Sequence, residues 1–301
     1  MKTIEGLQIF VRVAELSSFT QAAEQLALPK ARVSTVVQQL EGQLGTRLLH
    51  RTTRKVQLTQ DGQAFYERCK DLLADVDELQ GMFQQGVQSL RGRLRVDMPT
   101  LIARDQVIPR LPEFLAAHPQ LSIELSSTDR RVDLVREGFD CVLRVGTLAD
   151  SGLIARPVGQ LRQINCASPA YLAQHGTPET LEDLATHRLV HYVPTLGAKP
   201  SGWEYVQDGH VLSHAMAGML TVNGTEAYQA ACVAGLGLIQ APAAGLASWV
   251  ARGMLVEVMP QYRAPSLPVS LLYANRRNLP QRVQVFMAWL AQALAPYLDP
   301  L

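Results

Sequence analysis

The spacing of apolar residues changes near residue 90, and this change divides the chain into two parts that must fold differently. Up to Leu90, apolar residues recur three or four positions apart, which is the period of an amphipathic α-helix. From Leu94 onward, short apolar runs alternate with helical stretches. Strands that alternate with helices are typical of an α/β fold, here predicted to contain a largely parallel sheet. We therefore predict an all-α N-terminal part joined to an α/β domain.

Three helices are predicted in the first 45 residues. The first ends near Leu16–Ser18, the second covers Thr20–Ala27 and the third covers Lys30–Leu44. Ser18 or Thr20 can cap the second helix, and Gly45 suits the left-handed position that follows the third. The apolar face of the third helix is predicted to consist of Val33, Val36 or Val37, Leu40 and Leu44.

The second and third predicted helices, separated by a short break at Leu28-Pro29, form the pattern of a helix-turn-helix. In that motif the second helix enters the major groove of DNA and presents its first side chains to base edges. Arginine and lysine can pair with guanine, glutamine with adenine, and serine or threonine with either. The residues predicted to contact DNA in this region are Thr20, Lys30, Arg32, Ser34, Thr35 and Gln38.

A basic segment after the third helix is predicted to form a two-stranded wing. Val56 and Leu58 alternate with polar residues, as in a short strand. Between Leu28 and Leu58 the chain has six basic residues and one acidic residue, whereas the remainder has 22 basic and 26 acidic residues. A basic patch on an otherwise acidic chain suits a phosphate backbone, and a solvated basic face is the alternative. The tip residues predicted to contact the DNA backbone are Arg51, Thr52, Thr53 and Arg54.

A long helix is predicted over residues 61–90, because apolar residues continue there at steps of three or four. These residues are Phe65, Cys69, Leu72, Val76, Leu79, Phe83, Val87 and Leu90. Their spacing is close to the period of about 3.5 residues that a seam between two helices requires. We therefore predict that this helix pairs with the same helix of a second copy. The alternative is that this face packs on the C-terminal domain of its own chain.

Residues Phe10–Gly62 resemble the N-terminal domain of the LysR-type transcriptional regulators. The matching positions are Phe10-Val11-Arg12-Val13-Ala14-Glu15, Ser18-Phe19-Thr20, Ala22-Ala23, Leu26, Val33-Ser34, Leu40-Glu41, Leu44-Gly45, Arg47-Leu48-Leu49, Arg51-Thr52-Thr53-Arg54 and Leu58-Thr59-x-x-Gly62. One position departs from the family's pattern, because many members carry arginine directly after the recognition-helix serine, where this chain has Thr35. The resemblance thus implies a winged helix-turn-helix, but the family's half-site preference does not carry over.

The C-terminal two-thirds of the chain is similar to the two-lobed, periplasmic-binding-protein-like sensing domain of the same family. The matching stretches are Arg93-Leu94-Arg95-Val96, 133–140, Arg144-Val145-Gly146, 166–172 and Ala234-Gly235-Leu236-Gly237. The resemblance implies domains at residues 1–60, 61–90 and 91–301, with lobe I at 91–161 plus 268–301 and lobe II at 162–267. It also implies a sequence-specific transcription regulator whose DNA binding or activity responds to a small molecule bound between the lobes.

The effector site is expected at the carboxyl ends of the strands, where ligands bind in open α/β folds. The Pro99-Thr100 loop precedes a predicted helix, whose free N–H groups would favour an anion, with a small carboxylate as the first candidate. The resemblance places further loops opposite this one. The residues predicted to bind the effector are Pro99, Thr100, Val145, Gly146, Thr147, Trp203, Thr221 and Asn223.

Other classes of protein and site are disfavoured by the sequence. No apolar run reaches the ~18–20 residues that span a bilayer, and the first residues lack a secretory signal pattern, so we expect a cytoplasmic protein. Four scattered cysteines without a Cys-x-x-Cys pair argue against disulfides and zinc. The histidine pairs at four-residue spacing fall on a predicted strand (His191) and a predicted loop (210–214), so no metal and no cofactor is predicted.

One further helix in the C-terminal part is predicted over Thr177–Ala185.

Two alternative functions come from other classes. A solute-binding protein for transport would fit the two lobes alone. It gives the basic N-terminal part no role, and the sequence lacks the signal peptide that such a protein would carry. An enzyme with a site in the cleft is disfavoured because the sequence has neither a Gly-x-Ser-x-Gly elbow nor a phosphate-binding loop. The predicted partners are double-stranded DNA, a small-molecule effector, further copies of the chain in a dimer or tetramer, and RNA polymerase, with no membrane.

Overall fold

The computed structural model describes residues 2–51, 56–81, 90–148, 152–274 and 279–300 of the 301-residue chain. The contacts within it separate two compact units, Met1–Arg93 with His118–Ser122, and Leu94–Ala117 with Ile123–Leu301. The main division lies close to the residue at which the apolar spacing changes. Each periodicity therefore builds a core of its own.

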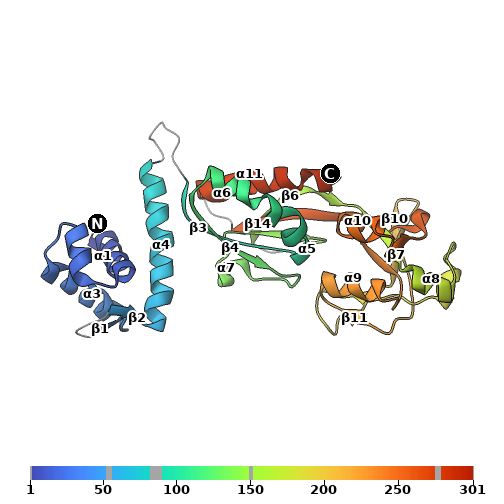
Figure 1. The fold of residues 1–301 in the computed structure, drawn as a ribbon, viewed down its shortest axis with the longest axis horizontal. Helices are drawn as coiled ribbons and strands as arrows, with labels where there is room; N and C mark the ends of the chain where they lie inside the picture. Colours follow the sequence, from blue (N-terminus) through green and yellow to red (C-terminus); the bar gives the residue numbers. More distant parts are fainter. Residues whose placement is uncertain (1, 52–55, 82–89, 149–151, 275–278, 301) are drawn as a thin grey trace. The chain divides into compact units, whose positions relative to one another are not determined.

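The first unit contains three helices, a two-stranded hairpin and a longer helix (Figure 1). Their bounds are α1 Lys2–Leu16, α2 Phe19–Gln25, α3 Lys30–Leu44, β1 Leu49–Arg51, β2 Val56–Leu58 and α4 Gln60–Gly81. The Ser18 hydroxyl accepts a hydrogen bond from the Gln21 N–H at 3.3 Å and so caps α2. Gly45 has a φ of 68°, which suits glycine, and it ends α3 at the predicted residue.

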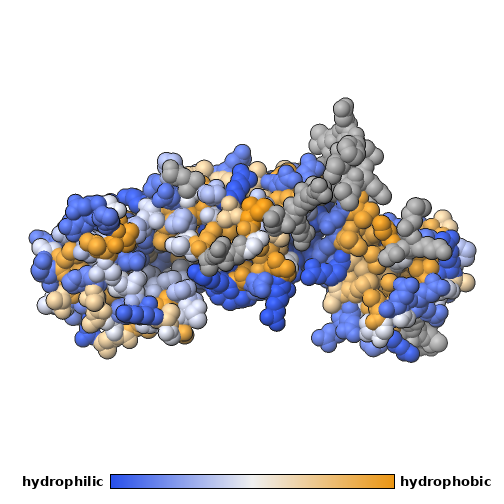
Figure 2. All heavy atoms as spheres, turned by 180° about the vertical axis from the view of Figure 1, so that it is seen from behind, coloured by the Kyte–Doolittle hydropathy of each residue, from blue (hydrophilic) through white to orange (hydrophobic). Residues whose placement is uncertain are grey.

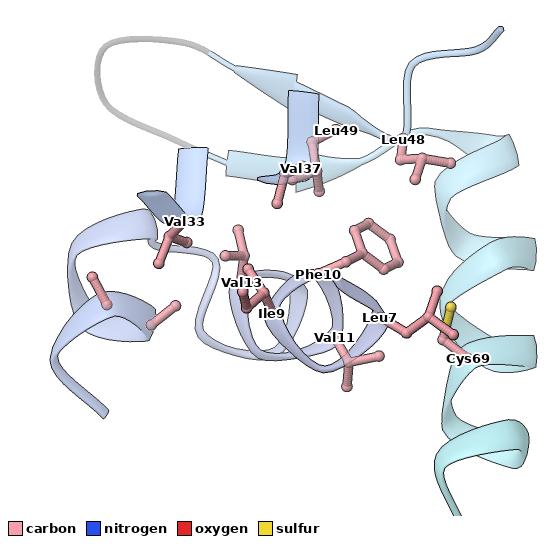
Figure 3. Packing of buried hydrophobic residues seen from close by; sticks show 12 residues of the cluster. Leu7, Ile9, Phe10, Val11, Val13, Val33, Val37, Leu48, Leu49 and Cys69 are labelled. Carbon is pink, nitrogen blue, oxygen red and sulfur yellow. The ribbon is translucent and has the colours of Figure 1, made fainter. Parts of the chain in front are cut away.

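The core of the first unit lies where α1 and α3 meet the hairpin and α4 (Figure 3). Phe10, Val33 and Val37 are fully buried there. The rings of Phe10 and Phe65 have centroids 5.4 Å apart, which joins α1 to α4. The predicted burial of Leu44 is wrong, because 44% of this residue is exposed at the end of α3.

The first half of α4 belongs to this core rather than to a seam between two chains. Phe65 packs against the cluster, and Cys69 is 2% exposed within it. The prediction that Phe65 and Cys69 belong to a seam between two helices is therefore wrong. Leu72, one turn further along, is 48% exposed, and residues 82–89 of the predicted helix lie outside the described residues.

The second unit is built from strands and short helices that alternate along the chain (Figure 1). The strands are β3 Arg91–Met98, β4 Gln120–Ser127, β5 Cys141–Val145, β6 Leu153–Leu161, β7 Gln163–Ala167, β8 His191–Tyr192, β9 Trp203–Gln207, β10 His210–His214, β11 Thr221–Val222, β12 Ile239–Pro242, β13 Val256–Glu257 and β14 Leu267–Ala274. The helices are α5 Thr100–Ile102, η1 Ala103–Val107, η2 Ile108–Arg110, α6 Leu111–Ala117, α7 Leu134–Glu137, α8 Pro169–His175, η3 Asp183–Thr186, α9 Thr225–Val233, α10 Ala243–Ala251, η4 Pro260–Tyr262, α11 Gln281–Leu294 and η5 Ala295–Tyr297.

The strands form a five-stranded sheet with the order β4-β3-β5-β14-β6, a three-stranded sheet β12-β7-β13, and the pairs β8-β11 and β9-β10. Strand β3 is parallel to β5, and β8 is parallel to β11. By contrast, β14 is antiparallel to both β5 and β6, and β7 is antiparallel to β12 and β13. The prediction of a largely parallel sheet is therefore wrong. The chain leaves the five-stranded sheet along β6 and returns along β14, so these adjacent strands run in opposite directions.

The prediction of a helix over Thr177–Ala185 is wrong. The structure has helix α8 at Pro169–His175 instead. The Ser168 hydroxyl caps α8 through the Tyr171 N–H at 3.3 Å, and proline suits the first helical position. In the predicted range, the Asp183 carboxylate accepts hydrogen bonds from the N–H groups of residues 179 and 180. Such local bonds compete with helix formation, and only the short η3 turn remains.

The segment His210–His214, interpreted as a loop from the sequence, is strand β10 of a hairpin with β9. The two-residue turn between them is Asp208-Gly209, with φ of 49° and 77°. Aspartate followed by glycine is a strong signal for a tight hairpin turn, because both positions need positive φ. The turn signal, rather than the histidine spacing, was the informative feature of this segment.

Hydrophilic residues are interspersed with apolar ones on the face of the protein that Figure 2 shows. Exposed large apolar residues include Val135 at 68% and Met219 at 80%. Such residues are normal on a surface when they are scattered. None of the helices that the structure describes is long and apolar enough to cross a membrane.

Candidate functional site: nucleic-acid interface and ligand cavity

Helix α3 has two faces of opposite character. Val33 and Val37 are fully buried against the core of the first unit. The predicted DNA-contacting residues Lys30, Arg32, Thr35 and Gln38 are exposed, as is Thr20 on α2, whereas Ser34 is half-buried. The structure therefore gathers the polar residues of α3 on an outward-facing surface, which a groove of DNA can reach.

Two of these side chains already have partners within the chain. Arg32 Nη2 lies 2.6 Å from Glu5 Oε1 of α1, and both side chains are about half exposed. A guanidinium has five N–H donors, so Arg32 can keep Glu5 and still bind another acceptor. The Thr35 hydroxyl donates to the Ala31 carbonyl oxygen at 2.9 Å, which leaves its oxygen free to accept from a base amino group.

The hairpin pairs Leu49 with Leu58 and Arg51 with Val56 in antiparallel register, as expected for a wing. Arg51 is the last residue of β1, and the predicted contacts Thr52, Thr53 and Arg54 lie outside the described residues.

Glu41, the one acid of the basic segment, attaches the hairpin to α3. Its Oε1 accepts hydrogen bonds from the N–H groups of Leu48 and Leu49 at 2.9 and 3.1 Å. A carboxylate that accepts two backbone N–H groups makes strong, charge-assisted bonds. Sequence reasoning counted Glu41 only as a charge, because nothing local shows that the chain turns back onto it.

The junction between the hairpin and α4 explains the Leu58-Thr59-x-x-Gly62 pattern. The Thr59 hydroxyl accepts from the Gly62 N–H at 2.9 Å and donates to the Arg47 carbonyl oxygen at 2.7 Å. The Thr59 N–H donates to the Leu48 carbonyl oxygen at 3.0 Å. A Cβ at Gly62 would come within 1.9 Å of that same oxygen, so only glycine lets α4 approach the hairpin.

The second unit contains a cavity of about 590 Å³, lined mainly by apolar side chains. This volume suits a small organic molecule. Among the predicted effector-binding residues, Pro99, Val145, Gly146 and Thr147 line the cavity. The structure thus brings the loops after β3 and β5 to the same hollow, at the carboxyl ends of two parallel strands.

The other four predicted effector-binding residues have different surroundings. Trp203 is fully buried in a core with Tyr171 and Leu238. Thr221 and Asn223 are exposed and do not line the cavity that the structure describes.

Thr100 lies beside the cavity, but its N–H is not free. It donates to Asp129 Oδ1 at 3.2 Å. The expectation of an open anion site at the start of α5 is corrected accordingly.

Charged residues beneath and around the cavity were not found from the sequence. Arg144 lines the cavity, and its Nη2 lies 2.7 Å from Oδ1 of Asp97, which is 0% exposed. Burial raises the pKa of the Asp97 carboxyl, and the neighbouring Arg144 opposes that shift. Asp129, Arg131 and Glu204 also line the cavity. Nothing in the sequence distinguishes these residues, because many polar loop residues closely follow a strand.

Two tyrosines of the cavity wall keep their protons at any physiological pH. Burial, with a smaller contribution from the charge of Asp129, raises the pKa of Tyr192 to about 12. Burial also raises the pKa of Tyr228, whose hydroxyl accepts a hydrogen bond from the Gln240 N–H at 3.1 Å. Both residues therefore offer the cavity neutral phenol groups.

Comparison with known proteins identifies both parts of the chain. Residues 4–63 match the family model described as a bacterial regulatory helix-turn-helix protein of the lysR family, and residues 88–295 match the LysR substrate binding domain. The chain is 49% identical to YhjC, an uncharacterized HTH-type transcriptional regulator of Escherichia coli, over 99% of this chain and 100% of that protein. It is 37% identical to an HTH-type transcriptional repressor of Pseudomonas aeruginosa, over 98% of this chain and 93% of that protein.

A solved structure is similar to this chain in fold. CrgA, a LysR-type transcriptional regulator from Neisseria meningitidis, is 30% identical, with a TM-score of 0.61 over 96% of this chain and 98% of that one. The two family models lie on the helix-turn-helix and on the α/β domain described above. The chain therefore belongs to the LysR-type transcriptional regulators and is a DNA-binding regulator of transcription, with a helix-turn-helix domain and a two-lobed effector-binding α/β domain.

Proposed function

We propose that this regulator reads its DNA site with the exposed face of α3 and places the hairpin tip on the phosphate backbone. The observation that carries this proposal is the contrast between buried Val33 and Val37 and their exposed neighbours Lys30, Arg32 and Gln38. The exposed residues have the side-chain types that pair with guanine and adenine. The excess of basic residues between 28 and 58 supplies the attraction to phosphate.

The cavity of the second unit is the proposed effector site. Its apolar lining and its position at the ends of β3 and β5 support this assignment. A ligand that binds one arrangement of the protein better than another shifts the population toward it, and this is how effector binding would change DNA binding.

Regulators of this family oligomerise, and we propose residues 61–90, which include most of α4, as the dimerising element within a dimer or tetramer. Exposed Leu72 supports a partner on the outer side of α4. The proposed domains remain residues 1–60, 61–90 and 91–301. We further propose a cytoplasmic location, RNA polymerase as a partner on DNA, and binding rather than catalysis in the cavity, in line with relatives named as transcriptional regulators.

Arg32→Ala should weaken binding to the DNA upstream of this protein's own gene by about 10- to 100-fold, as expected for loss of one base contact. Binding to scrambled DNA of equal length should weaken far less, because a lost base contact affects only the correct sequence. Fluorescence anisotropy titrations on both fragments at one salt concentration measure the two affinities.

Arg12→Ala is the matched control. Arg12 lies on α1, pairs with Glu15 at 3.0 Å and is about as exposed as Arg32. It removes the same charge from the same unit, so it should leave the preference for the native fragment unchanged. Equal losses on native and scrambled DNA for Arg32→Ala would remove this residue from the base-reading set.

A further inference from the structure

Asp129 joins two distant segments at the wall of the cavity. Its Oδ1 accepts a hydrogen bond from the Thr100 N–H at 3.2 Å. Its Oδ2 accepts from both the N–H and the hydroxyl of Thr225, at 2.7 and 2.8 Å. Asp129 follows β4, Thr100 begins α5 and Thr225 begins α9, so three separate parts of the second unit meet at one carboxylate.

This carboxylate accepts the N–H groups that a helix start would otherwise offer to an anionic ligand. The first N–H groups of a helix lack partners within the helix and carry partial positive charge, which favours an anion. Here the starts of α5 and α9 both direct an N–H to Asp129. A ligand carboxylate at the same place would find these donors used and would face a like charge.

The other charged groups of the cavity also disfavour a ligand carboxylate. Arg144 already pairs with Asp97, and Arg131 is exposed at the edge. Glu204 adds a second carboxylate to the lining. Beside the Asp129 contacts, Arg104 of η1, which directly follows α5, pairs with Glu226 of α9 at 2.6 Å.

We propose that Asp129 is an internal substitute for a ligand carboxylate: it holds the starts of α5 and α9 together and excludes carboxylates from that end of the cavity. The effector accordingly carries no carboxylate at the end of the cavity that Asp129 and Thr225 line. This specificity rests on the proposal that the cavity is the effector site. The role of Asp129 as an internal anion does not depend on that proposal.

Chemical rescue of the full-length Asp129→Ala variant tests the inference. Removing the carboxylate should lower the melting temperature by about 3–8 °C, given the usual relation between stability and melting temperature in domains of this size. Sodium acetate should then restore much of the loss in a saturable manner, because acetate fits the vacated position. Sodium chloride at equal ionic strength should not, and acetate should give the wild-type protein no saturable gain.

Two further variants make the result specific. Asp133→Ala removes another helix-capping carboxylate, which accepts from the Arg136 N–H at 3.0 Å, and acetate should not rescue it beyond sodium chloride. Thr225→Val should lower the melting temperature of the wild type but have little effect in the Asp129→Ala background, since the shared contact is already lost.

The inference is overturned if Asp129→Ala melts like the wild type, if acetate acts no better than sodium chloride on it, or if acetate stabilises both proteins equally. These outcomes are separate from those for the DNA-reading role. A wild-type protein that bound native and scrambled DNA equally would contradict that role, and the rescue result would still stand.

Discussion

Replacing Gly62 by alanine should lower the free energy of unfolding of the first unit by about 3 kcal/mol, the upper part of the usual range for overpacking. Specific DNA binding should be lost with it. The added Cβ would lie 1.9 Å from the Leu48 carbonyl oxygen, which is backbone and cannot turn aside. The Thr59 N–H donates to that same oxygen, so relief of the clash must break the junction between hairpin and α4. Urea unfolding followed by circular dichroism, together with a DNA titration, measures both effects.

Gly42→Ala provides the control within the same unit. Gly42 lies inside α3, and a Cβ there would meet no atom within 4 Å. Alanine should raise stability slightly, by at most about 1 kcal/mol, because glycine weakens a helix interior. If Gly62→Ala behaved like Gly42→Ala, the close approach of α4 to Leu48 would be wrong.

Asp97→Asn should destabilise the second unit by about 3–5 kcal/mol, the usual cost of breaking a buried ion pair. Asp97 is 0% exposed and Arg144 13% exposed, so removal of one charge leaves the other poorly hydrated. The amide retains the shape of the carboxyl group, and the effect therefore reports charge rather than a cavity. Urea unfolding of the full chain, followed by the fluorescence of tryptophans in the second unit, measures the loss.

The control for Asp97→Asn is Glu226→Gln, which breaks an ion pair of similar length. Arg104 and Glu226 lie 2.6 Å apart, but both side chains are 55% exposed. Water screens and hydrates such charges, so the change should cost less than about 1 kcal/mol. Similar small losses from both variants would show that Asp97 and Arg144 are better hydrated than the structure implies.

The elements that sequence reasoning located best carry local signals at both ends. Helix α3 runs over the predicted Lys30–Leu44, because Pro29 precedes it and Gly45 can adopt the left-handed conformation that ends it. The short strand predicted from the alternation at Val56 and Leu58 is β2, Val56–Leu58. In these segments the residues adjacent in sequence decide the structure, and the bounds can be found without knowing any distant contact.

The seam prediction failed in part because periodicity shows which side of a helix is apolar, not what covers it. Phe65 and Cys69 continue the same spacing as Leu72, yet they pack against α1 in the core of the first unit. Leu72 is exposed although Leu73, the next residue, still packs against the core. Only the packing of α1 against α4 in three dimensions shows which residues of α4 are covered.

The cavity could be located only in outline, because its residues come from loops far apart in sequence. The loop at Pro99 was found from the helix predicted after it, and residues 145–147 were found through the family resemblance. Asp129 was not, although it alters the chemistry of Thr100 next to them. Whether a helix start is open or already occupied depends on a carboxylate 29 residues away, which no local pattern reports.

The most direct test of the central claim is a titration of the wild-type protein with the DNA upstream of its own gene and with scrambled DNA, at two salt concentrations. If α3 reads bases while basic residues contact phosphate, binding should be tight and salt-dependent, with a clear preference for the native fragment at both concentrations. Equal and weak binding to the two fragments at both salt concentrations would contradict it.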